Sequence, residues 1–139
     1  MINTINMQDM RYMNLFEKIT GVSTRFCFKY NDFIIFIVPQ QMISKAIGEG
    51  GKNIRRMSEI LARRIKVVPT PNGNYDIKKF IENIVSPATF RGVDIGENEI
   101  VVASAGTQSK AALMGRDKKR LFELQKISKD FLGKDLRII

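Results

Sequence analysis

A chain of 139 residues, 44% of them apolar, can fill one ordinary core or two very small ones, which excludes a large multidomain enzyme and argues against intrinsic disorder. With no histidine and a single cysteine, Cys27, the chain cannot form an internal disulfide, an imidazole or thiolate-clustered metal site, or a Ser-His-Asp or Cys-His nucleophile. The formal net charge of +9 points to an anionic partner, which is either a nucleic acid or an acidic surface.

The beginning of the chain predicts a helix followed by a β-hairpin. Gly21 is a C-cap signal that ends a run of apolar residues at helical spacing. These apolar residues are Met10, Met13, Phe16 and Ile19. The alternation of apolar and polar residues over 22–30 predicts a half-buried strand, and Asn31-Asp32 predicts a turn into a second strand at 33–38.

Two helices separated by a break are predicted next. Residues 40–47 predict a short helix, residues 48–51 a break, and residues 52–64 a longer helix. The side chains expected to face inward from the longer helix are Ile54, Met57, Ile60 and Leu61. Residues 65–68 predict a final short strand.

The rest of the chain predicts the same order of elements after a short boundary. Residues 69–74, Pro-Thr-Pro-Asn-Gly-Asn, suit neither a helix nor a strand, so we expect one domain over 1–70 and another over 71–139. The predicted elements of the second domain are a helix at 77–85, strands near 89–95 and 99–104, a helix from Gln108, a break at Gly115, a helix at 119–131 and a strand at 136–139.

An offset of 67 residues relates the two halves and places Gly48 on Gly115. The match continues without a gap over residues 31–60 of the first copy. The charge is divided in the same way: residues 41–68 hold seven basic and two acidic residues, residues 108–137 hold nine and four, and each segment therefore carries +5. We expect two copies of one unit, each with a basic patch.

The most specific local signal is the glycine-rich turn Ile47-Gly-Glu-Gly-Gly-Lys-Asn-Ile54. Glycines let a backbone approach a ligand closely, and the start of the following helix presents N–H groups to a phosphate. A Walker A loop is excluded because Ala46 and Asn53 stand where that motif needs glycine and Ser or Thr. The dinucleotide fingerprint is excluded because it needs glycine at Asn53 and a strand directly before the turn.

The pattern of helix, Gly-X-X-Gly and helix resembles the K-homology (KH) domain, whose loop clamps a four-nucleotide single strand by its backbone. Gly48-Glu49-Gly50-Gly51 matches that loop. The element order is similar to the type II variant, because a type I second copy would need a further strand and helix after Ile139. The resemblance implies an α+β fold of two tandem type II KH domains, each a three-stranded mixed sheet with helices packed on one face.

The tandem arrangement, with almost no linker and with Ser86-Pro87-Ala88 before the second hairpin, resembles the paired KH region of the NusA family. In free-standing form it is similar to the archaeal members, and the resemblance covers about residues 7–139. It implies binding of single-stranded RNA, a role in transcription elongation or termination, and RNA polymerase as a further partner. Another KH protein, such as a ribosomal or RNA-processing component, would share this fold.

The resemblance implies that RNA contacts both loops and the starts of the helices behind them. In the first copy these residues are Ile47, Gly48, Glu49, Gly50, Gly51, Lys52, Asn53, Arg55 and Arg56. In the second copy they are Gly115, Arg116, Asp117, Lys118 and Lys119. Short pockets beside the first loop, lined by Ile47, Ile54 and Val67, would receive bases.

Two residues depart from the favourable loop pattern. Glu49 places a carboxylate where an RNA backbone is expected, and Lys118 replaces the last glycine of the second loop. We expect the Lys118 side chain to restrict how closely RNA approaches, although its charge could contact a phosphate instead.

Two other patterns have structural as well as functional interpretations. The basic residues after the first loop could be a solvated helix face, but they adjoin the loop and recur in the second copy, which favours RNA contact. They are Arg55, Arg56, Arg63, Arg64 and Lys66.

The alternating Phe26, Phe28 and Tyr30 are expected to be buried in the core rather than to stack on bases. Nothing near Cys27 in the sequence activates its thiol, which we expect to be inert.

The carboxylates are scattered and form no recognisable catalytic set, so we expect a non-enzyme without a cofactor or metal. No apolar run of about 18 residues and no signal-peptide pattern occurs, which predicts a cytoplasmic protein that does not bind a membrane. An alternative function is a protein-interaction scaffold that docks on RNA polymerase or a ribosomal particle through its basic faces and binds little RNA.

Overall fold

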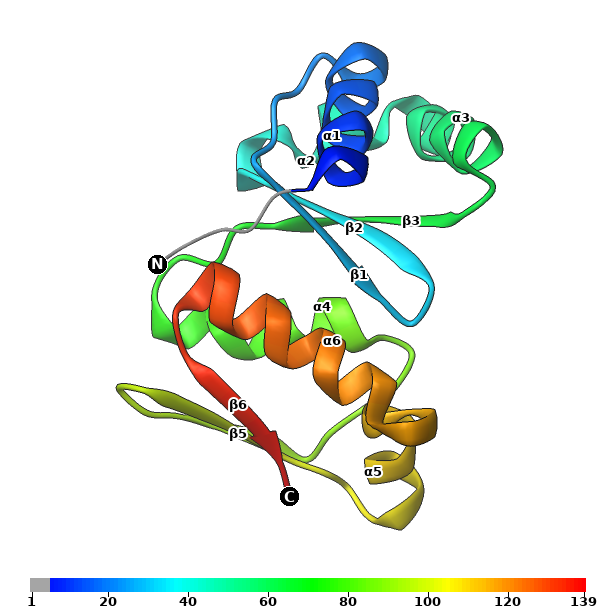
Figure 1. Ribbon diagram of the computed structural model, residues 1–139. Helices are drawn as coiled ribbons and strands as arrows, with labels where there is room; N and C mark the ends of the chain where they lie inside the picture. Colours follow the sequence, from blue (N-terminus) through cyan, green and yellow to red (C-terminus); the bar gives the residue numbers. More distant parts are fainter. Residues whose placement is uncertain (1–5) are drawn as a thin grey trace. The chain divides into compact units, whose positions relative to one another are not determined.

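The computed structural model describes residues 6–139, which form two compact units that join between Thr70 and Pro71 (Figure 1). Each unit is a three-stranded mixed sheet with helices on one face, as the α+β expectation requires. Among the described residues, no helix combines the length and the apolar character needed to cross a membrane.

The first unit begins with α1 (Met7–Thr20), which has a defined cap at each end. The side chain of Asn6 accepts a hydrogen bond from the Asp9 backbone N–H at 2.7 Å, and Gly21 ends the helix in a left-handed conformation. The elements that follow are β1 (Phe26–Tyr30), β2 (Phe33–Val38), η1 (Gln40–Met42), α2 (Ile43–Ile47), η2 (Glu49–Gly51), α3 (Lys52–Leu61) and β3 (Arg64–Pro69).

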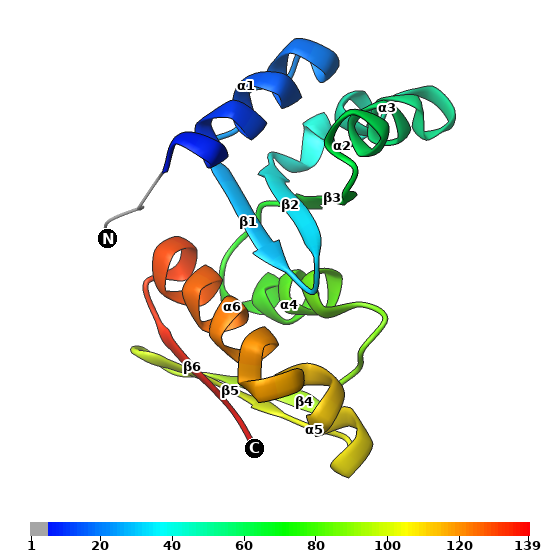
Figure 2. The ribbon, with the colours of Figure 1, turned by 45° about the vertical axis from the view of Figure 1, so that its right-hand side comes forward.

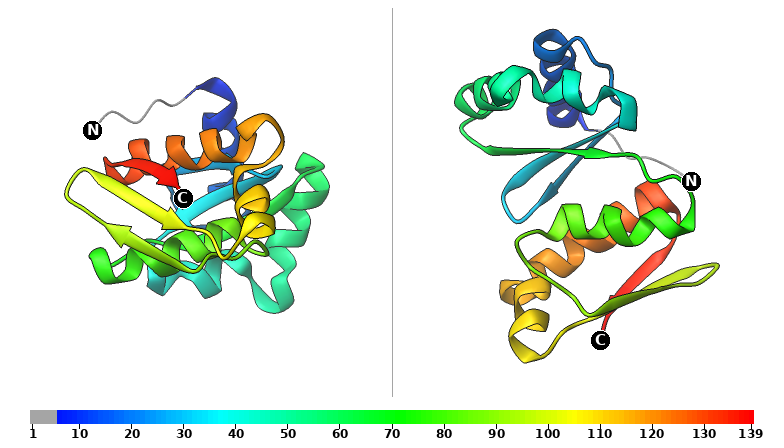
Figure 3. Two further views of the ribbon diagram at one scale, coloured as in Figure 1. Left: turned by 90° about the horizontal axis from the view of Figure 1, so that it is seen from below. Right: turned by 180° about the vertical axis from the view of Figure 1, so that it is seen from behind.

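The first sheet has the order β1-β2-β3, so the central strand is β2 (Figures 1 and 3). Strands β1 and β2 form an antiparallel hairpin in which Tyr30 pairs with Phe33. Strand β3 is parallel to β2, with Ile34 opposite Ile65. Parallel neighbours need a crossover connection, and here the crossover consists of α2, the glycine loop and α3.

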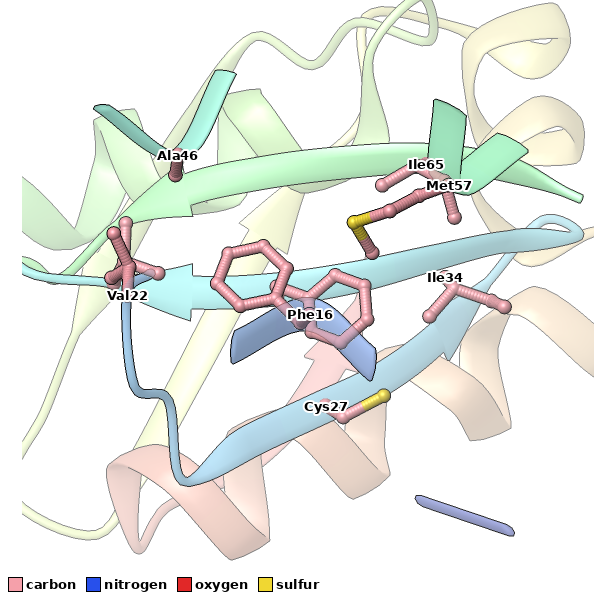
Figure 4. Close-up of a cluster of buried hydrophobic side chains, with 9 residues drawn as sticks. Phe16, Val22, Cys27, Ile34, Ala46, Met57 and Ile65 are labelled. Carbon is pink, nitrogen blue, oxygen red and sulfur yellow. The ribbon is translucent and has the colours of Figure 1, made fainter. Parts of the chain in front are cut away.

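The core of the first unit lies between this sheet and its helices (Figure 4). Phe16 of α1 stacks on Phe36 of β2 with the ring centroids 4.4 Å apart, and Met57 of α3 is fully buried beside them. Cys27 belongs to the same cluster, where burial, followed by the nearby Asp9 carboxylate, raises the pKa of its thiol to about 12. Ala46 of α2 is also fully buried in this cluster, so the cluster fixes both helices that carry the glycine loop.

The second unit repeats the order with small changes. Its elements are η3 (Asn74–Asp76), α4 (Ile77–Val85), β4 (Gly92–Ile95), β5 (Glu99–Ala103), α5 (Thr107–Met114), η4 (Arg116–Lys118), α6 (Lys119–Ile127), η5 (Ser128–Leu132) and β6 (Asp135–Ile138). The sheet order is β4-β5-β6, with β5 antiparallel to β4 and parallel to β6 (Figure 2).

The two faces of the second sheet differ sharply in polarity. Ile100 and Val102 of β5 are fully buried, as are the inward residues of α4 and α6. On the opposite face the Arg137 guanidinium contacts the Glu99 carboxylate at 3.2 Å, and both side chains are about half exposed. This alternation shows which face carries the core of the second unit.

Several predicted helix details are wrong. Helix α3 ends at Leu61 rather than at residue 64, because Ala62 has a left-handed backbone and Arg64 already belongs to β3. Ile60 and Met10 do not pack inward, since their side chains are 54% and 53% exposed. The last helix is α-helical to Ile127 and continues as the π-helical turn η5 to Leu132, close to the predicted end at residue 131.

The first strand of each predicted hairpin begins later than expected, because side-chain hydrogen bonds occupy the preceding segment. The Thr24 hydroxyl donates to the Ile37 carbonyl at 2.6 Å, and β1 begins only at Phe26. In the second unit the Ser109 hydroxyl of α5 donates to the Thr89 carbonyl at 2.6 Å, and β4 begins at Gly92.

The aromatic residues of β1 lie on the sheet face that points away from the helices. Phe28 and Tyr30 are buried as predicted, whereas Phe26 is partly exposed. The residue of β1 that faces the helices is Cys27, which belongs to the core cluster. Both faces of this strand therefore carry buried residues.

The two units have the same order of elements, but the offset between corresponding residues is not constant at 67. Ile34, on the helix face of β2, corresponds to Ile100 on the helix face of β5, an offset of 66 rather than 67. Their parallel partners Ile65 and Leu136 differ by 71. The added residues before β6 are accommodated where the second unit has the turn η5.

Candidate nucleic-acid interface

The first loop has a backbone that favours glycine at three positions. Gly48 has φ 79° and ψ 164°, a conformation that is essentially restricted to glycine. Gly50 and Gly51 are left-handed, with φ of 61° and 76°. The Gly51 N–H donates to the Gly48 carbonyl at 3.0 Å and closes the turn directly before α3.

The second loop has nearly the same backbone despite its different sequence. Gly115 has φ 75° and ψ 175°, and Asp117 and Lys118 take left-handed conformations with φ of 55° and 62°. The Lys118 N–H donates to the Gly115 carbonyl at 3.2 Å. The loss of the last glycine therefore changes the chemistry of the loop surface while the shape of the turn is kept.

A side chain from the second helix of each pair holds the loop in place. The Asn53 amide Nδ2 donates to the Lys45 carbonyl at 3.1 Å, and the Arg120 guanidinium donates to the Ala112 carbonyl at 2.9 Å. Both the donors and the acceptors of these two hydrogen bonds are related by the offset of 67. Sequence analysis assigned Asn53 to RNA contact and missed Arg120, although the offset alone connects the two.

The same two side chains explain why each loop retains its first glycine. A Cβ added at Gly48 would lie 2.9 Å from Asn53 Cγ, and one at Gly115 would lie 2.7 Å from Arg120 Cγ. By contrast, a Cβ at Gly50 would meet nothing within 4 Å. The middle of the loop is therefore open on the side from which a ligand would approach.

Most of the predicted RNA-contacting residues are exposed at the two helix starts. The exposed residues of the first loop region are Glu49, Gly50, Lys52, Arg55 and Arg56, and those of the second are Arg116, Asp117, Lys118 and Lys119. Ile47, Gly48, Gly51, Asn53 and Gly115 are half-buried. The Arg55 guanidinium donates to the Gly50 carbonyl and so supports the loop as well as adding charge.

The N-termini of α3 and α6 add a partial positive charge at these loops. Helix α3 has 10 residues and α6 has 9, and their first N–H groups point toward the loop. The N-cap residues, Gly51 and Lys118, both lie in the described part of the chain, and neither makes a side-chain cap hydrogen bond. The N–H groups that such a cap would occupy suit a phosphate oxygen.

The predicted base pocket of the first unit is lined by partly exposed apolar side chains. Ile47, Ile54 and Val67 are all half-buried, and Ile54 and Val67 pack on the edge of the core cluster. Their inner atoms are held by the core while their outer atoms stay accessible. This arrangement is compatible with a shallow apolar surface beside the loop.

Part of the first basic cluster lies away from the loop surface. Arg64 and Lys66 belong to β3, and their charged groups lie 4.3 and 4.6 Å from the centroid of the Phe33 ring. Burial, followed by the charge of Arg64, lowers the pKa of Lys66. Arg64 and Lys66 therefore do not share a helix with the rest of the cluster, and Arg55 and Arg56 are the members that adjoin the loop.

Among residues 6–139, no group of three or more His, Cys, Asp or Glu side chains is arranged to hold a metal ion.

Comparison with known proteins finds several relatives that carry the same name. The chain is 30% identical over 116 residues to the "Probable transcription termination protein NusA" of Halococcus morrhuae, covering 82% of this chain and 81% of that protein. It is 25% identical over 139 residues to the protein of the same name from Methanococcus vannielii, covering 97% and 79%. It is 26% identical over 125 residues to that of Methanocaldococcus jannaschii, covering 88% and 67%.

A solved structure supports the fold. The crystal structure of APE1850 superposes with a TM-score of 0.66 at 23% identity, covering 97% of this chain and all of that one. No protein-family model matches the chain.

Proposed function

The chain belongs to the family of archaeal NusA-like proteins, and on that premise we propose that it binds single-stranded RNA through its tandem KH-like units during transcription elongation or termination. The observation that carries the proposal is the first loop. It combines an open backbone at Gly50, the N-terminus of a ten-residue helix and exposed basic side chains within one turn. Backbone N–H groups and a helix start are the elements that bind phosphates most readily.

RNA phosphates are proposed to lie across Gly50 and Gly51, where no side chain separates the ligand from the backbone. Lys52 and Arg56 extend from the following helix turn and contribute charge. Glu49 is exposed and its carboxylate repels phosphate, so affinity comes from the sum of several contacts. Bases would then lie over the half-buried Ile47, Ile54 and Val67.

The second loop is proposed to contact phosphates with side chains rather than with its backbone. Asp117 and Lys118 carry side chains where the first loop has none, so close approach to the backbone is hindered. Arg116, Lys118 and Lys119 supply positive charge at the same place. We expect this loop to give a salt-dependent contribution with little sequence preference.

The protein is proposed to act by binding alone, as a cytoplasmic factor with RNA polymerase as a further partner. Its candidate site consists of a loop, two helix starts and basic side chains, which position a nucleic acid but supply no nucleophile or general base. The scaffold alternative would use the same basic faces to dock on a protein surface. Loop substitutions distinguish the two functions, because they should lower RNA affinity only if the loops bind RNA.

The test is fluorescence anisotropy of short, labelled single-stranded RNAs at two salt concentrations. The variant Gly50→Asp with Gly51→Asp places two carboxylates on the loop. Asp117 and Lys118 adopt left-handed conformations at the corresponding positions of the second loop, so we expect the double variant to fold. The matched control, Asn74→Asp with Tyr75→Asp, makes the same charge change at exposed positions outside both loops.

Wild type and control should bind with an affinity that falls as salt rises. A plot of the logarithm of the binding constant against the logarithm of the salt concentration should have a slope of about −0.7 per phosphate contact. The loop variant should bind more weakly and with a shallower slope. Equal binding by all three proteins would contradict the RNA-clamp proposal, because the first loop would not be the site. Binding by none would contradict it as well and would favour the scaffold. Thermal unfolding of each variant separates loss of binding from loss of fold.

A further inference from the structure

Within the described chain, the second sheet presents one face to the helices of its unit and leaves the opposite face open. Helices α4 and α6 lie over the first face, on which Ile100 and Val102 are buried (Figure 1). The opposite face, which we call the open sheet face, consists of three rows of residues that run across β4, β5 and β6. The rows are Gly96-Glu99-Asp135, Asp94-Val101-Arg137 and Gly92-Ala103-Ile139.

The open sheet face combines exposed charges with a strip of small residues. The exposed charged residues are Asp94, Glu99, Asp135 and Arg137. Gly92, Val101 and Ala103 are half-buried, and a Cβ added at Gly92 would meet nothing within 4 Å. The strip therefore has room for side chains of a partner. Protein interfaces have the same composition, with an apolar centre and a polar rim.

The negative charge of this face lies along the hairpin of β4 and β5. Residues 92–109 hold three acidic residues and no basic one, in a chain whose formal net charge is +9. The three are Asp94, Glu97 and Glu99. Among the described residues, Asp94 and Glu97 form no ion pair. Both are exposed, so their carboxylates are available to a partner.

The β6 side of the face is electrically balanced. The Arg137 guanidinium contacts the Glu99 carboxylate at 3.2 Å, and the Lys129 ammonium contacts the Asp135 carboxylate at 3.3 Å. The charges of each pair cancel at a distance. The excess negative charge of the open sheet face is therefore at the two unpaired carboxylates of the hairpin.

The turn that carries Glu97 is held by the beginning of β6. The Lys134 ammonium donates to the Gly96 and Glu97 carbonyls at 2.6 and 2.7 Å, so its charge is directed at the backbone of the turn. The Asp135 N–H donates to the Asn98 carbonyl at 3.0 Å. The turn is therefore ordered before a partner binds, which lowers the entropy that binding would cost.

The turn of this hairpin and the second loop lie at opposite ends of the second unit (Figures 1, 2 and 3). Helix α5, which leads into the loop, is at the end of the sheet away from the turn. The loop carries Arg116, Lys118 and Lys119. An RNA backbone is thus attracted to one end of the unit and repelled at the other. A positively charged protein surface suits the open sheet face better than RNA does.

Polymerases supply a surface of that kind, because the channels in which they carry single-stranded nucleic acid are positively charged. A chain with a net charge of +9 is repelled by such a surface over most of its own. The acidic hairpin is the exception, since its carboxylates are attracted to the surface instead.

We propose that the open sheet face docks on a positively charged surface of RNA polymerase while the loops hold RNA. The inference rests on the proposed function, in which RNA polymerase is a further partner, and it assigns that contact to the acidic face of the second unit. The scaffold alternative would use the basic faces instead. The three rows contain fewer residues than the roughly 20–30 that a stable interface uses on each side, so the contact is transient.

The test measures binding of the fluorescently labelled chain to purified RNA polymerase of the source organism, freed of nucleic acid so that RNA cannot bridge the two proteins. The variant Asp94→Lys with Glu97→Lys reverses the charge of the hairpin. The matched control, Glu59→Lys with Glu82→Lys, makes the same charge change at exposed positions of α3 and α4.

Wild type and control should bind the polymerase with an affinity that falls as salt rises. The hairpin variant should bind about tenfold more weakly or less, because two like charges then face the polymerase. Its affinity for single-stranded RNA should not fall, since both loops are intact. Thermal unfolding of each variant separates loss of docking from loss of fold.

Cross-linking locates the contact independently of charge. The only cysteine of the chain, Cys27, is buried, so Asn98→Cys provides a single exposed thiol in the hairpin for a photo-cross-linker. Ala111→Cys provides one on α5, at the opposite end of the unit. The Asn98→Cys variant should cross-link to polymerase subunits and the Ala111→Cys variant should not.

The outcomes separate this inference from the proposed RNA binding. Equal polymerase binding by the hairpin variant and its control, or cross-linking from Ala111→Cys alone, would overturn the docking face and favour the basic faces. Absence of polymerase binding by the wild type would overturn it as well, and the RNA clamp would still stand if RNA binds at the first loop. Docking through the hairpin by a chain that binds no RNA would support this inference and contradict the clamp.

Discussion

Asn53 and Arg120 have the same role in the two units, because each donates a side-chain hydrogen bond to the carbonyl eight residues earlier, at 3.1 and 2.9 Å. The two side chains differ in length and charge, yet both join the helix after the loop to the helix before it. The turn between the helices is thus fixed by a side-chain contact as well as by its glycines.

Replacement of Asn53 by alanine should loosen the first loop. Loss of one hydrogen bond to a partly exposed carbonyl should lower the free energy of unfolding by about 1 kcal/mol. It should also weaken RNA binding, because the loop amides are no longer held in one arrangement. Urea denaturation and RNA anisotropy measure the two effects.

The matched control is Asn53→Arg, which introduces the residue that the second unit uses at this position. It should retain the hydrogen bond to the Lys45 carbonyl and the stability of the wild type. If Asn53→Ala and Asn53→Arg lose the same amount of stability, the hydrogen bond does not hold the loop.

The first glycine of each loop should be more sensitive to substitution than the third residue. Gly48→Ala forces a side chain into a backbone conformation essentially restricted to glycine and against Asn53, at a cost of about 1–3 kcal/mol. Gly50→Ala meets open space and incurs only the left-handed penalty, about 1 kcal/mol. Thermal unfolding of the two variants should rank Gly48→Ala as the less stable, and the reverse order would contradict this account.

Helix α3 offers a direct test of which side chains pack inward. Met57 is fully buried in the core cluster, so Met57→Ala should reduce the free energy of unfolding by about 2–5 kcal/mol. Ile60, three residues later, is 54% exposed, and Ile60→Ala should change it by about 0.5 kcal/mol or less. Similar losses for both variants would show that Ile60 is buried.

The thiol of Cys27 should be unreactive in the folded protein. Its pKa is raised to about 12 by burial, with a smaller contribution from Asp9, so it stays protonated at pH 8. Ellman's reagent should react slowly with the native chain and quickly after unfolding in guanidinium chloride. Rapid reaction of the native chain would place Cys27 at the surface.

The raised pKa of the Cys27 thiol also predicts that the stability of the fold depends on pH. Between the ordinary thiol pKa of 9.0 and about 12, the unfolded thiol loses its proton while the folded one retains it. The unfolded state therefore binds fewer protons, and the free energy of unfolding falls as the pH rises through this range. Cys27→Ala removes this contribution, so its stability should fall less steeply with pH, as measured by urea denaturation.

The glycine pattern and the element order were sufficient to predict the fold and the position of both loops. The offset of 66 between the central strands β2 and β5 was not predictable. Residues 33–38 are apolar without interruption and therefore give no period that assigns each side chain to a face of the sheet. The shape of the second loop was not predictable either. Asp117 and Lys118 are left-handed only because the surrounding contacts hold the turn, among them the Arg120 hydrogen bond.

The roles of Asn53 and Arg120 illustrate the same limit at the level of side chains. Both are polar residues beside a basic loop, and composition alone favours RNA contact for each. Only the structure shows that their polar groups reach a backbone carbonyl of the preceding helix. The internal repeat carried the signal, since two different donors occur at one repeated position.

Contact between RNA phosphates and the backbone of the first loop is tested most directly by amide chemical-shift mapping. A ¹⁵N-labelled chain would be titrated with a short single-stranded RNA, and the shift of each backbone amide followed. We predict the largest changes at Gly50, Gly51 and Lys52, with smaller changes around the second loop. Large changes confined to residues outside both loops, with these three amides unmoved, would contradict the RNA clamp.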